Sequence, residues 1–354
     1  MRAQISIGYM NKSIRQTDIA RVANVSQATV SLVLDGKADV GRVSAATRQR
    51  IGQVAREMGY LPNIVARQLR GSRSGLIGVL AGLGSAPVIF DRMLALERAA
   101  LERGYRTLVG QFGGNLELAD QYVSDFAARR VDGTICMTHE YRERPEAIAR
   151  LVSRLHNVVY LRQPAVTDAH YIHVDAADCI HQAVGHLTGK GRKRIGLVIL
   201  DDFYQANLHR RQGYAEAMKR HNLPLEEALV WVGDDRLLPN PHEVSNDKAA
   251  EVVQELVITR RADSIIAIND DWAAQLIKAI RRLGLSVPGD VSVVGQGNFK
   301  IASFFDPEIT TLDPQNEVFA EAAMDMLAGL IEKGGADTLK SVTVKPKLIV
   351  RQSA

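Results

Sequence analysis

The chain has 354 residues, a length that predicts two or three compact units rather than one domain. Its ordinary hydrophobic share of 46%, with 28 Gly and 11 Pro, excludes a disordered or fibrous protein. The net charge is only +4, but residues 1–74 hold twelve Lys and Arg against four Asp and Glu, a net +8 that leaves −4 for the remainder. A basic N-terminal segment on a slightly acidic body is the charge pattern expected of a protein that contacts phosphates.

Residues 1–13 are predicted to form a flexible extension. The start lacks the apolar run of a signal peptide and no stretch is long enough to span a membrane, so we expect a cytoplasmic protein. Cys136 and Cys179 lack the spacing of a metal site, which predicts two buried free thiols in a reducing compartment. No metal and no other cofactor is expected.

The stretch from Thr17 to Leu34, TDIARVANVSQATVSLVL, predicts two short helices joined by a tight turn. Apolar residues recur at helical spacing on both sides of Asn24-Val25-Ser26. Asn tolerates the left-handed backbone that such a turn requires, and the Ser26 hydroxyl can cap the second helix. This pattern is typical of a helix-turn-helix.

The second helix of this pair presents an outer face of Gln27, Ala28, Thr29, Ser31 and Leu32. In a DNA-binding helix-turn-helix this is the face that enters the major groove. The alternative is a plain helical hairpin inside an α-domain, since such hairpins are common.

A third helix is predicted after Ser44, an N-cap residue, with an apolar stripe that ends before Gly59. It completes a small all-α head over residues 14–61. Residues 62–74 then read as a helix of about two turns followed by a basic, Gly- and Ser-containing segment. A helix this short is marginal alone. The segment is therefore either a linker or a hinge helix that folds only when two copies pair over DNA.

From Gly75 onward, apolar runs typical of buried parallel strands alternate with helical patterns. We predict strands at 75–80, 107–110, 133–137, 158–162 and 171–174, and a second set at 194–200, 228–233, 264–270 and 291–296. The pattern predicts that residues 75–354 form two α/β lobes in series with a ligand cleft between them. Ligands bind at the carboxyl ends of such strands, which here carry Asp201, Asp202, Asn269, Asp270 and Gln296-Gly297-Asn298.

Over residues 14–352 the chain resembles transcription regulators of the lactose-repressor (LacI) family. The resemblance lies in the order and spacing of DIARVANVSQATVSLVLDGK, TRQRI, EMGYLPNIVARQL, GLIGVL, GRKRIGLV, RRQGY, AINDDWA, LGLSVPGDVSVVG and ITTL. It implies a helix-turn-helix head joined by a hinge helix to a two-lobed, periplasmic-binding-protein-like domain. It also implies a homodimer that binds a near-palindromic operator, with half-site centres about 34–36 Å apart.

The resemblance assigns DNA-binding roles to residues of the head and the hinge. Gln27 and Ala28 would read bases, and Leu32 replaces a base-reading Arg found in many members. Thr29 and Ser31 would lie nearer phosphates, and Tyr60 and Asn63 would contact the DNA backbone. Thr17 and Ser26 are also expected to contact DNA. Ala66 would lie against the minor-groove floor, and Leu69 would insert as an apolar wedge that kinks the duplex.

The resemblance also implies a small-molecule effector site between the lobes. Arg210 matches the ligand-binding Arg of an RxxGY pattern, and Asn269 matches a hydrogen-bonding residue. Ile89 or Phe90 would form an apolar wall. Gln296 and Asn298 flank Gly297, which replaces a sugar-binding carboxylate. With Arg211 beside Arg210, the effector is either a sugar or an acidic ligand such as a sugar acid.

The resemblance implies a repressor whose DNA binding is controlled by its effector. Members in which the ligand releases DNA and members in which the ligand is required for DNA binding share these motifs, so both directions of control stay open. The chain ends at Ala354 without a leucine-heptad tail, which favours a dimer over a tetramer.

A carbohydrate receptor without a DNA role would have a signal peptide and no basic head. An enzyme is disfavoured because no nucleophile elbow, P-loop or metal-binding pair occurs. His170, His173, His181 and His186 lack carboxylate support and are interpreted as surface residues.

Overall fold

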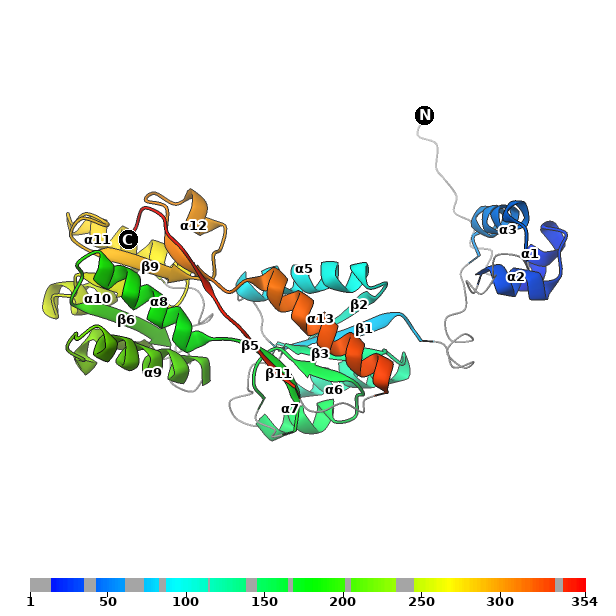
Figure 1. Cartoon of the computed structure of the whole chain (residues 1–354), viewed down its shortest axis with the longest axis horizontal. Coiled ribbons are helices and arrows are strands. Elements are labelled where there is room, and N and C mark those ends of the chain that lie inside the picture. Colours follow the sequence, from blue (N-terminus) through cyan, green and yellow to red (C-terminus); the bar gives the residue numbers. More distant parts are fainter. Residues whose placement is uncertain are drawn as a thin grey trace, which may run out of the picture. The chain divides into compact units, whose positions relative to one another are not determined.

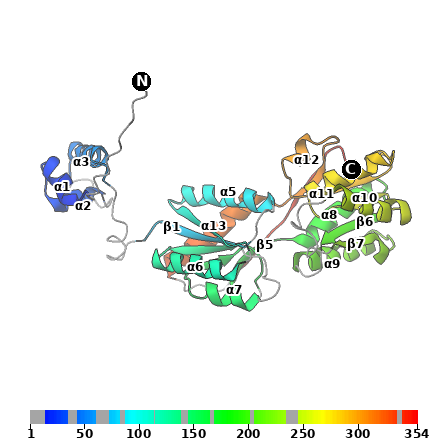
Figure 2. The same cartoon turned by 180° about the vertical axis from the view of Figure 1, so that it is seen from behind.

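The computed structural model describes residues 14–34, 43–60, 73–82, 87–113, 115–137, 145–164, 168–200, 205–233, 245–334 and 340–354. The chain divides into two compact units, Met1–Arg73 and Ser74–Ala354, which Figures 1 and 2 show from opposite sides. We call the first unit the head. The second unit contains two lobes.

The head consists of three helices, α1 (Gln16–Val22), α2 (Gln27–Leu34) and α3 (Ala45–Glu57). Asn24 has a φ of 49°, and the Ser26 hydroxyl accepts a 3.1 Å hydrogen bond from the Thr29 amide. Ser44 likewise caps α3. The core contains Ile19, Ala20, Ala23, Val30, Ile51 and Ala55. The predicted turn, caps and three-helix core are therefore confirmed.

Each lobe of the second unit is built on one six-stranded sheet. Lobe 1 has the order β11-β5-β4-β3-β1-β2, with every pair parallel. Lobe 2 has the order β12-β10-β9-β8-β6-β7, in which only the β12 pairing is antiparallel. The two orders are similar, so the lobes repeat one architecture.

The elements of lobe 1 are β1 (Leu76–Ala81), α5 (Pro87–Glu102), β2 (Arg106–Gln111), α6 (Leu116–Ala128), β3 (Gly133–Met137), α7 (Pro145–Val152), β4 (Val158–Tyr160), β5 (His170–Val174), α13 (Asn316–Lys333) and β11 (Ser341–Val344). Alternate residues of β1 serve the two faces of the sheet: Ile77 and Val79 pack under α5 and α13, whereas Leu80 packs under α6 and α7. Figures 1 and 2 show these two helix layers.

The elements of lobe 2 are α8 (Ala176–Gly189), β6 (Ile195–Leu200), α9 (Gln205–Arg220), the short helix η1 (Glu227–Leu229), β7 (Val230–Gly233), α10 (Asn246–Val253), the π-helical turn η3 (Gln254–Thr259), β8 (Ser264–Ile266), α11 (Asp270–Arg282), β9 (Ser292–Gln296), α12 (Ile301–Phe304), β10 (Thr310–Asp313) and β12 (Lys347–Ile349). Helices α8 and α9 cover one face, and α10 and α11 cover the other.

The sequence pattern predicts two lobes in series, and this prediction is wrong because the chain passes between the lobes three times. The chain passes from β5 into α8, returns from β10 into α13, and leaves again from β11 into β12. Strands β10, β11 and β12 were not predicted. Local patterning identifies a strand but not its partner, and these three strands have only three or four residues each.

The three crossovers between the lobes are tied together by hydrogen bonds. The Asp175 amide donates to the Val344 carbonyl at 3.0 Å. The Gln182 side chain donates to the Pro346 carbonyl and accepts from the Leu348 amide. The Gln315 side chain donates to the Lys345 carbonyl at 2.7 Å. Because each crossover leaves from the carboxyl end of a strand, the carboxyl edges of both sheets face the crossover region.

Gly213 and Tyr214, from the RRQGY motif, fix α9 in lobe 2. A Cβ on Gly213 would lie 2.7 Å from Cα and 2.8 Å from the carbonyl oxygen of Ala177, so only glycine permits this approach of α9 to α8. The Tyr214 ring is fully buried and its hydroxyl donates to the Ile195 carbonyl at 2.6 Å. Together they set which side of α9 faces the sheet.

Replacing Gly213 with Ala should destabilise the second unit, because the added methyl group meets backbone that cannot move without shifting α8. Overpacking of this kind costs roughly 1–3 kcal/mol. Gly329→Ala, in the interior of α13 with nothing within 4 Å of the added Cβ, is the control and should stabilise the protein by up to about 1 kcal/mol. Thermal unfolding of the full chain compares them; equal melting temperatures would contradict the close packing.

Candidate functional site

The outer face of α2 is uncovered within the head. Ser26, Gln27 and Ala28 are exposed, whereas Thr29, Ser31 and Leu32 are half-buried. Val30, on the opposite side, is fully buried against α1 and α3. Thr17 is exposed in the first turn of α1. The polar face therefore points outward while the apolar face holds the helix in place, as a recognition helix requires.

The remaining predicted DNA contacts have different positions. Tyr60 is half-buried against the head core, and its amide donates to the Ala55 carbonyl. Asn63, Ala66 and Leu69, with the rest of the predicted hinge helix, lie outside the described residues. Their roles stay predictions.

Arg210 and Gln296 come together at the carboxyl edge of the lobe 2 sheet. Arg210, in the second turn of α9, donates from Nε to Gln296 Oε1 at 3.1 Å and from Nη1 to Asn207 Oδ1 at 2.8 Å. Gln296, the last residue of β9, is buried and donates to the Ala267 carbonyl. The guanidinium is thus held by two neutral amides.

Burial lowers the pKa of Arg210 below its ordinary value, because the charged form has lost part of its hydration. Within the described ranges, no carboxylate forms an ion pair with this side chain. Arg211 is different: it pairs with Glu227 at 2.6 Å on the surface. Arg211, whose position beside Arg210 supported the prediction of an acidic ligand, thus has its own carboxylate partner, since adjacent helical residues face different directions.

The two predicted asparagines already have structural partners. Asn269 caps α11 by accepting from the Trp272 amide at 2.9 Å, which leaves its own amide N–H groups without an acceptor among the described residues. Asn298 donates to Asp313 and accepts from Arg351, so it supports the β10 end of a crossover. Asn269 thus retains donors for a ligand, whereas Asn298 is engaged on both sides of its amide. Their effector roles stay predictions.

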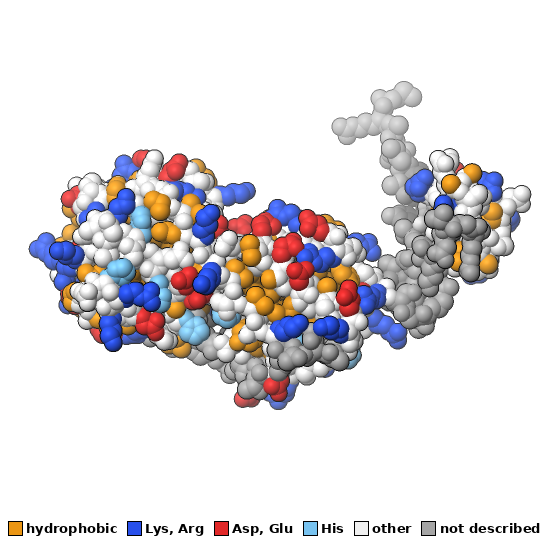
Figure 3. Space-filling model, viewed as in Figure 1, with side chains coloured by type: hydrophobic (Ala, Val, Ile, Leu, Met, Phe, Trp, Pro, Cys, Tyr) orange, Lys and Arg blue, Asp and Glu red, His pale blue; other side chains and the backbone are white. Residues whose placement is uncertain are grey.

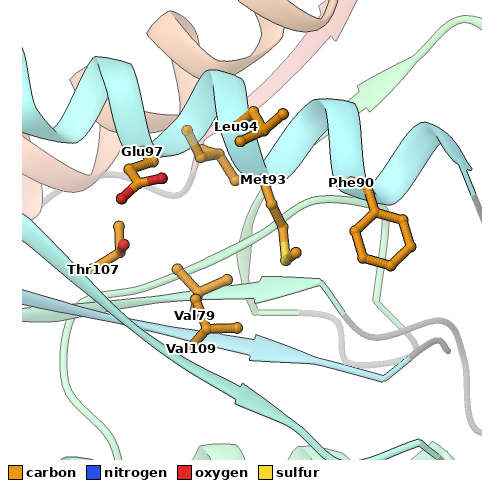
Figure 4. A pocket seen from close by; sticks show the side chains of 8 residues that line it. Val79, Phe90, Met93, Leu94, Glu97, Thr107 and Val109 are labelled. Atoms are coloured by element: carbon orange, nitrogen blue, oxygen red, sulfur yellow. The ribbon is translucent and has the colours of Figure 1, made fainter. Parts of the chain in front are cut away.

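Ile89 and Phe90, the predicted apolar wall, lie in different surroundings. Ile89 is buried in the core of lobe 1. Phe90 is 46% exposed and lines an apolar groove with Met93, Leu94 and Val109 on α5 and the edge strand β2 (Figure 4). Their contact with an effector stays a prediction.

Sequence reasoning missed Arg92, in the second turn of α5. Its Nε donates to Asn316 Oδ1 at 3.2 Å, and its guanidinium carbon lies 4.0 Å from the centre of the Phe319 ring. Burial and the nearby Arg162 guanidinium lower the pKa of Arg92 to about 9. Its signal in the sequence was a cationic residue early in a helix that follows a buried strand.

The four histidines do not converge on one point. His170 accepts from the Lys340 amide, His173 lies 3.4 Å from the Thr343 hydroxyl, and His181 lies 3.4 Å from Glu216. All four are half-buried rather than fully exposed, which corrects their interpretation as surface residues. Among the described residues, no three His, Cys, Asp or Glu side chains are placed to hold a metal ion.

Cys136 and Cys179 are both buried, and neither forms a disulfide. Among the helices in the described residues, none is both long enough and apolar enough to cross a membrane.

Asp270, at the start of α11, is a fully buried carboxylate beside the lobe 2 site. It accepts hydrogen bonds from the Phe299 amide and the Thr311 hydroxyl. Burial raises its pKa to about 6, although these donors and Arg351 oppose the shift. Gly295 makes room for it, since a Cβ there would lie 2.1 Å from Asp270 Oδ1.

Comparison with known proteins agrees with this architecture. Residues 17–63 match the family described as bacterial regulatory proteins, lacI family, and residues 184–354 match the periplasmic binding protein-like domain. The chain is 29% identical over 344 residues to the HTH-type transcriptional repressor PurR of Salmonella arizonae, and 28% identical over 339 residues to the HTH-type transcriptional regulator DegA of Bacillus subtilis. Each alignment covers 95% of this chain, with 95% of the PurR chain and 96% of the DegA chain.

Solved structures show the same fold. The lac repressor dimer bound to operator and the anti-inducer ONPF matches with a TM-score of 0.78 at 23% identity, over 97% of this chain and 99% of that chain. The complex of the transcriptional regulator CelR with cellobiose matches with a TM-score of 0.67 at 23% identity, over 96% and 100%. The head and the two crossed lobes define a helix-turn-helix regulator with a periplasmic-binding-protein-like domain. The chain thus combines a lacI-family helix-turn-helix domain with a periplasmic-binding-protein-like domain, and the relatives named above, which it matches over 95% of its length, are transcriptional regulators.

The raised pKa of Asp270 makes the stability of the protein pH-dependent. Because the folded state holds the proton more tightly than the unfolded state, this group contributes most at low pH, and its contribution is lost as the pH rises through about 6. Relative to Asp270→Asn, the wild type should lose about 1 kcal/mol of unfolding free energy between about pH 5 and 7.5. Denaturant unfolding of both proteins measures this, and parallel pH curves would contradict it.

Proposed function

We propose that this protein is a dimeric transcriptional repressor that binds operator DNA through α2 and responds to a small molecule bound between its lobes. The observation that carries the proposal is the outward polar face of α2, held by a buried apolar face in a helix-turn-helix. The match of the whole chain to regulators, head and lobes together, supports it.

In this proposal, Gln27 and Ala28 read base edges in the major groove. A glutamine amide can pair with an adenine in a bidentate manner, and Leu32 can contact a thymine methyl group. Thr17, Ser26, Thr29, Ser31 and Tyr60 would contact phosphates, which position the head without reading sequence. Asn63, Ala66 and Leu69 keep their proposed hinge roles.

The dimer is proposed to form along α5 and the edge strand β2. Phe90, Leu94, Leu101 and Val109 are 44–57% exposed here, and an edge strand with large exposed apolar neighbours calls for a covering partner. A second copy of the chain is that partner, as the lac repressor relative is a dimer on its operator. Figure 3 shows acidic and basic side chains interspersed over much of the lobes. The groove is lined mainly by apolar side chains, with Glu97 as the charged residue among those that line it (Figure 4).

Ligand control is proposed to act through the crossovers. A ligand held by both lobes favours one arrangement of the lobes over another, and it shifts the operator affinity only as far as it prefers that arrangement. Related structures hold cellobiose and D-xylulofuranose, which supports a sugar-type effector. The protein is proposed to act in the cytoplasm, without catalysis.

Operator binding tests the reading face. Fluorescence anisotropy with fragments from around the gene should show tight binding that weakens steeply with salt. Gln27→Ala should weaken specific binding by roughly 1–3 kcal/mol, because it removes a base contact, and leave non-specific binding unchanged. Gln53→Ala, an exposed glutamine on α3 that bonds to Glu57, is the matched control and should bind normally. An equal loss in both variants would refute the assignment of α2.

Leu94→Glu tests the dimer surface. A second carboxylate in the groove, added to that of Glu97, should convert the dimer to a monomer and reduce operator affinity at least about tenfold, since the two heads no longer bind as a linked pair. Leu283→Glu, a similarly exposed leucine of lobe 2, is the control. Analytical ultracentrifugation reports the mass, and a Leu94→Glu protein that stays dimeric would contradict the surface.

A further inference from the structure

Two arginines occupy equivalent positions in the two lobes. Helix α5 follows β1 and α9 follows β6, and these strands hold the same place in the order of their sheets. Each helix has 16 residues, and Arg92 and Arg210 are both the sixth residue. The repeated architecture therefore places one arginine near the carboxyl edge of each sheet, and both edges face the crossover region.

Both arginines differ from other arginines of the second unit in their partners. Arg103 forms ion pairs with Glu321 and Asp325, Arg194 pairs with Glu226, and Arg211 pairs with Glu227. These three arginines are half-buried, as Arg92 and Arg210 are, so the difference lies in the partners. Arg92 and Arg210 instead bond to amide oxygens of Asn316, Gln296 and Asn207. Within the described ranges, no carboxylate pairs with either one.

This arrangement is costly without a ligand. A half-buried cation loses part of its hydration, which neutral amides only partly restore. Around Arg92 the cost is higher, because the Arg162 guanidinium lies close enough to oppose its charge. Half-buried charges that lack a carboxylate partner, as these two do among the described residues, are typical of functional sites, where a ligand supplies the opposite charge.

The chemistry of the surroundings defines the class of ligand. A guanidinium offers a planar set of N–H donors that matches the paired oxygens of a carboxylate or phosphate. The amide donors of Asn269, which have no acceptor among the described residues, lie at the same edge of lobe 2 and suit hydroxyl oxygens. A neutral sugar would satisfy hydrogen bonds but would leave both charges uncompensated.

We infer that the effector is an anion, a carboxylate or phosphate on a hydroxyl-bearing carbon chain, and that Arg92 of lobe 1 and Arg210 of lobe 2 hold it together. The inference rests on the proposed ligand control and adds the charge of the effector and the role of Arg92.

The test uses matched pairs of ligands on the full-length protein with its operator. D-gluconate and D-glucose, D-galacturonate and D-galactose, and D-glucose 6-phosphate are compared by calorimetry and by operator anisotropy. At least one acid or phosphate should bind and change operator affinity while its neutral parent does not, and the pairs distinguish carboxylate from phosphate. A neutral sugar that acts where its acid does not overturns the anionic effector but leaves ligand control intact.

Arg92→Gln and Arg210→Gln should each weaken binding of the active anion at least tenfold. The controls are Arg98→Gln on α5 and Arg211→Gln on α9, whose arginines pair with Glu317 and Glu227. These two variants should bind the anion normally. The melting temperature without ligand should stay equal or rise in Arg92→Gln, because a half-buried charge beside Arg162 is removed. A lower melting temperature with unchanged ligand affinity would show a purely structural role and overturn the inference.

A cell metabolite extract covers ligands outside this panel. Passed over an anion-exchange resin, it should lose the activity that changes operator binding and yield it again on salt elution. Activity in the unretained fraction overturns the anionic effector. An extract without activity in any fraction, for a protein that binds its operator specifically, contradicts ligand control and with it this inference.

Discussion

The structure depends on the three crossovers that join the lobes. Each leaves from the carboxyl end of a strand, and hydrogen bonds of Gln182, Gln315 and the Asp175 amide hold them side by side. This constraint turns the same edge of both sheets toward one region. The fold thus creates a place where groups from two separate cores can act on one ligand, and where their separation can change without disturbing either core.

Local packing then fixes the groups at that edge. The absence of a side chain at Gly213 and the anchored ring of Tyr214 determine the rotation of α9, which presents Arg210 to Gln296. Gly295 similarly admits the buried carboxylate of Asp270 at the start of α11. Gly213 and Gly295 are glycines because a neighbouring helix residue lies too close for a Cβ atom. The positions of Arg210 and Asp270 depend on this close packing.

Much of the fold could be predicted from the sequence, because its signals are local. The turn at Asn24, the caps at Ser26 and Ser44, and most strands of both sheets lie where the pattern placed them. Residues 310–349 could not be assigned, because which lobe a short strand joins is decided by pairing over long distances. Arg92 was missed for the same reason: its burial comes from α13, more than 200 residues later.

The return of α13 and β11 to lobe 1 also bears on how the protein is made. During synthesis the head can complete its core once about sixty residues have emerged, since all its helices lie within that length. Lobe 1 cannot, because one of the two helices that cover one face of its sheet, and the strand at one edge of that sheet, are the last parts of it to be translated. The part of the apolar face that α13 covers stays open while the whole of lobe 2 up to β10 is made. A nascent chain therefore has a finished head long before the lobe that is proposed to pair two copies is complete.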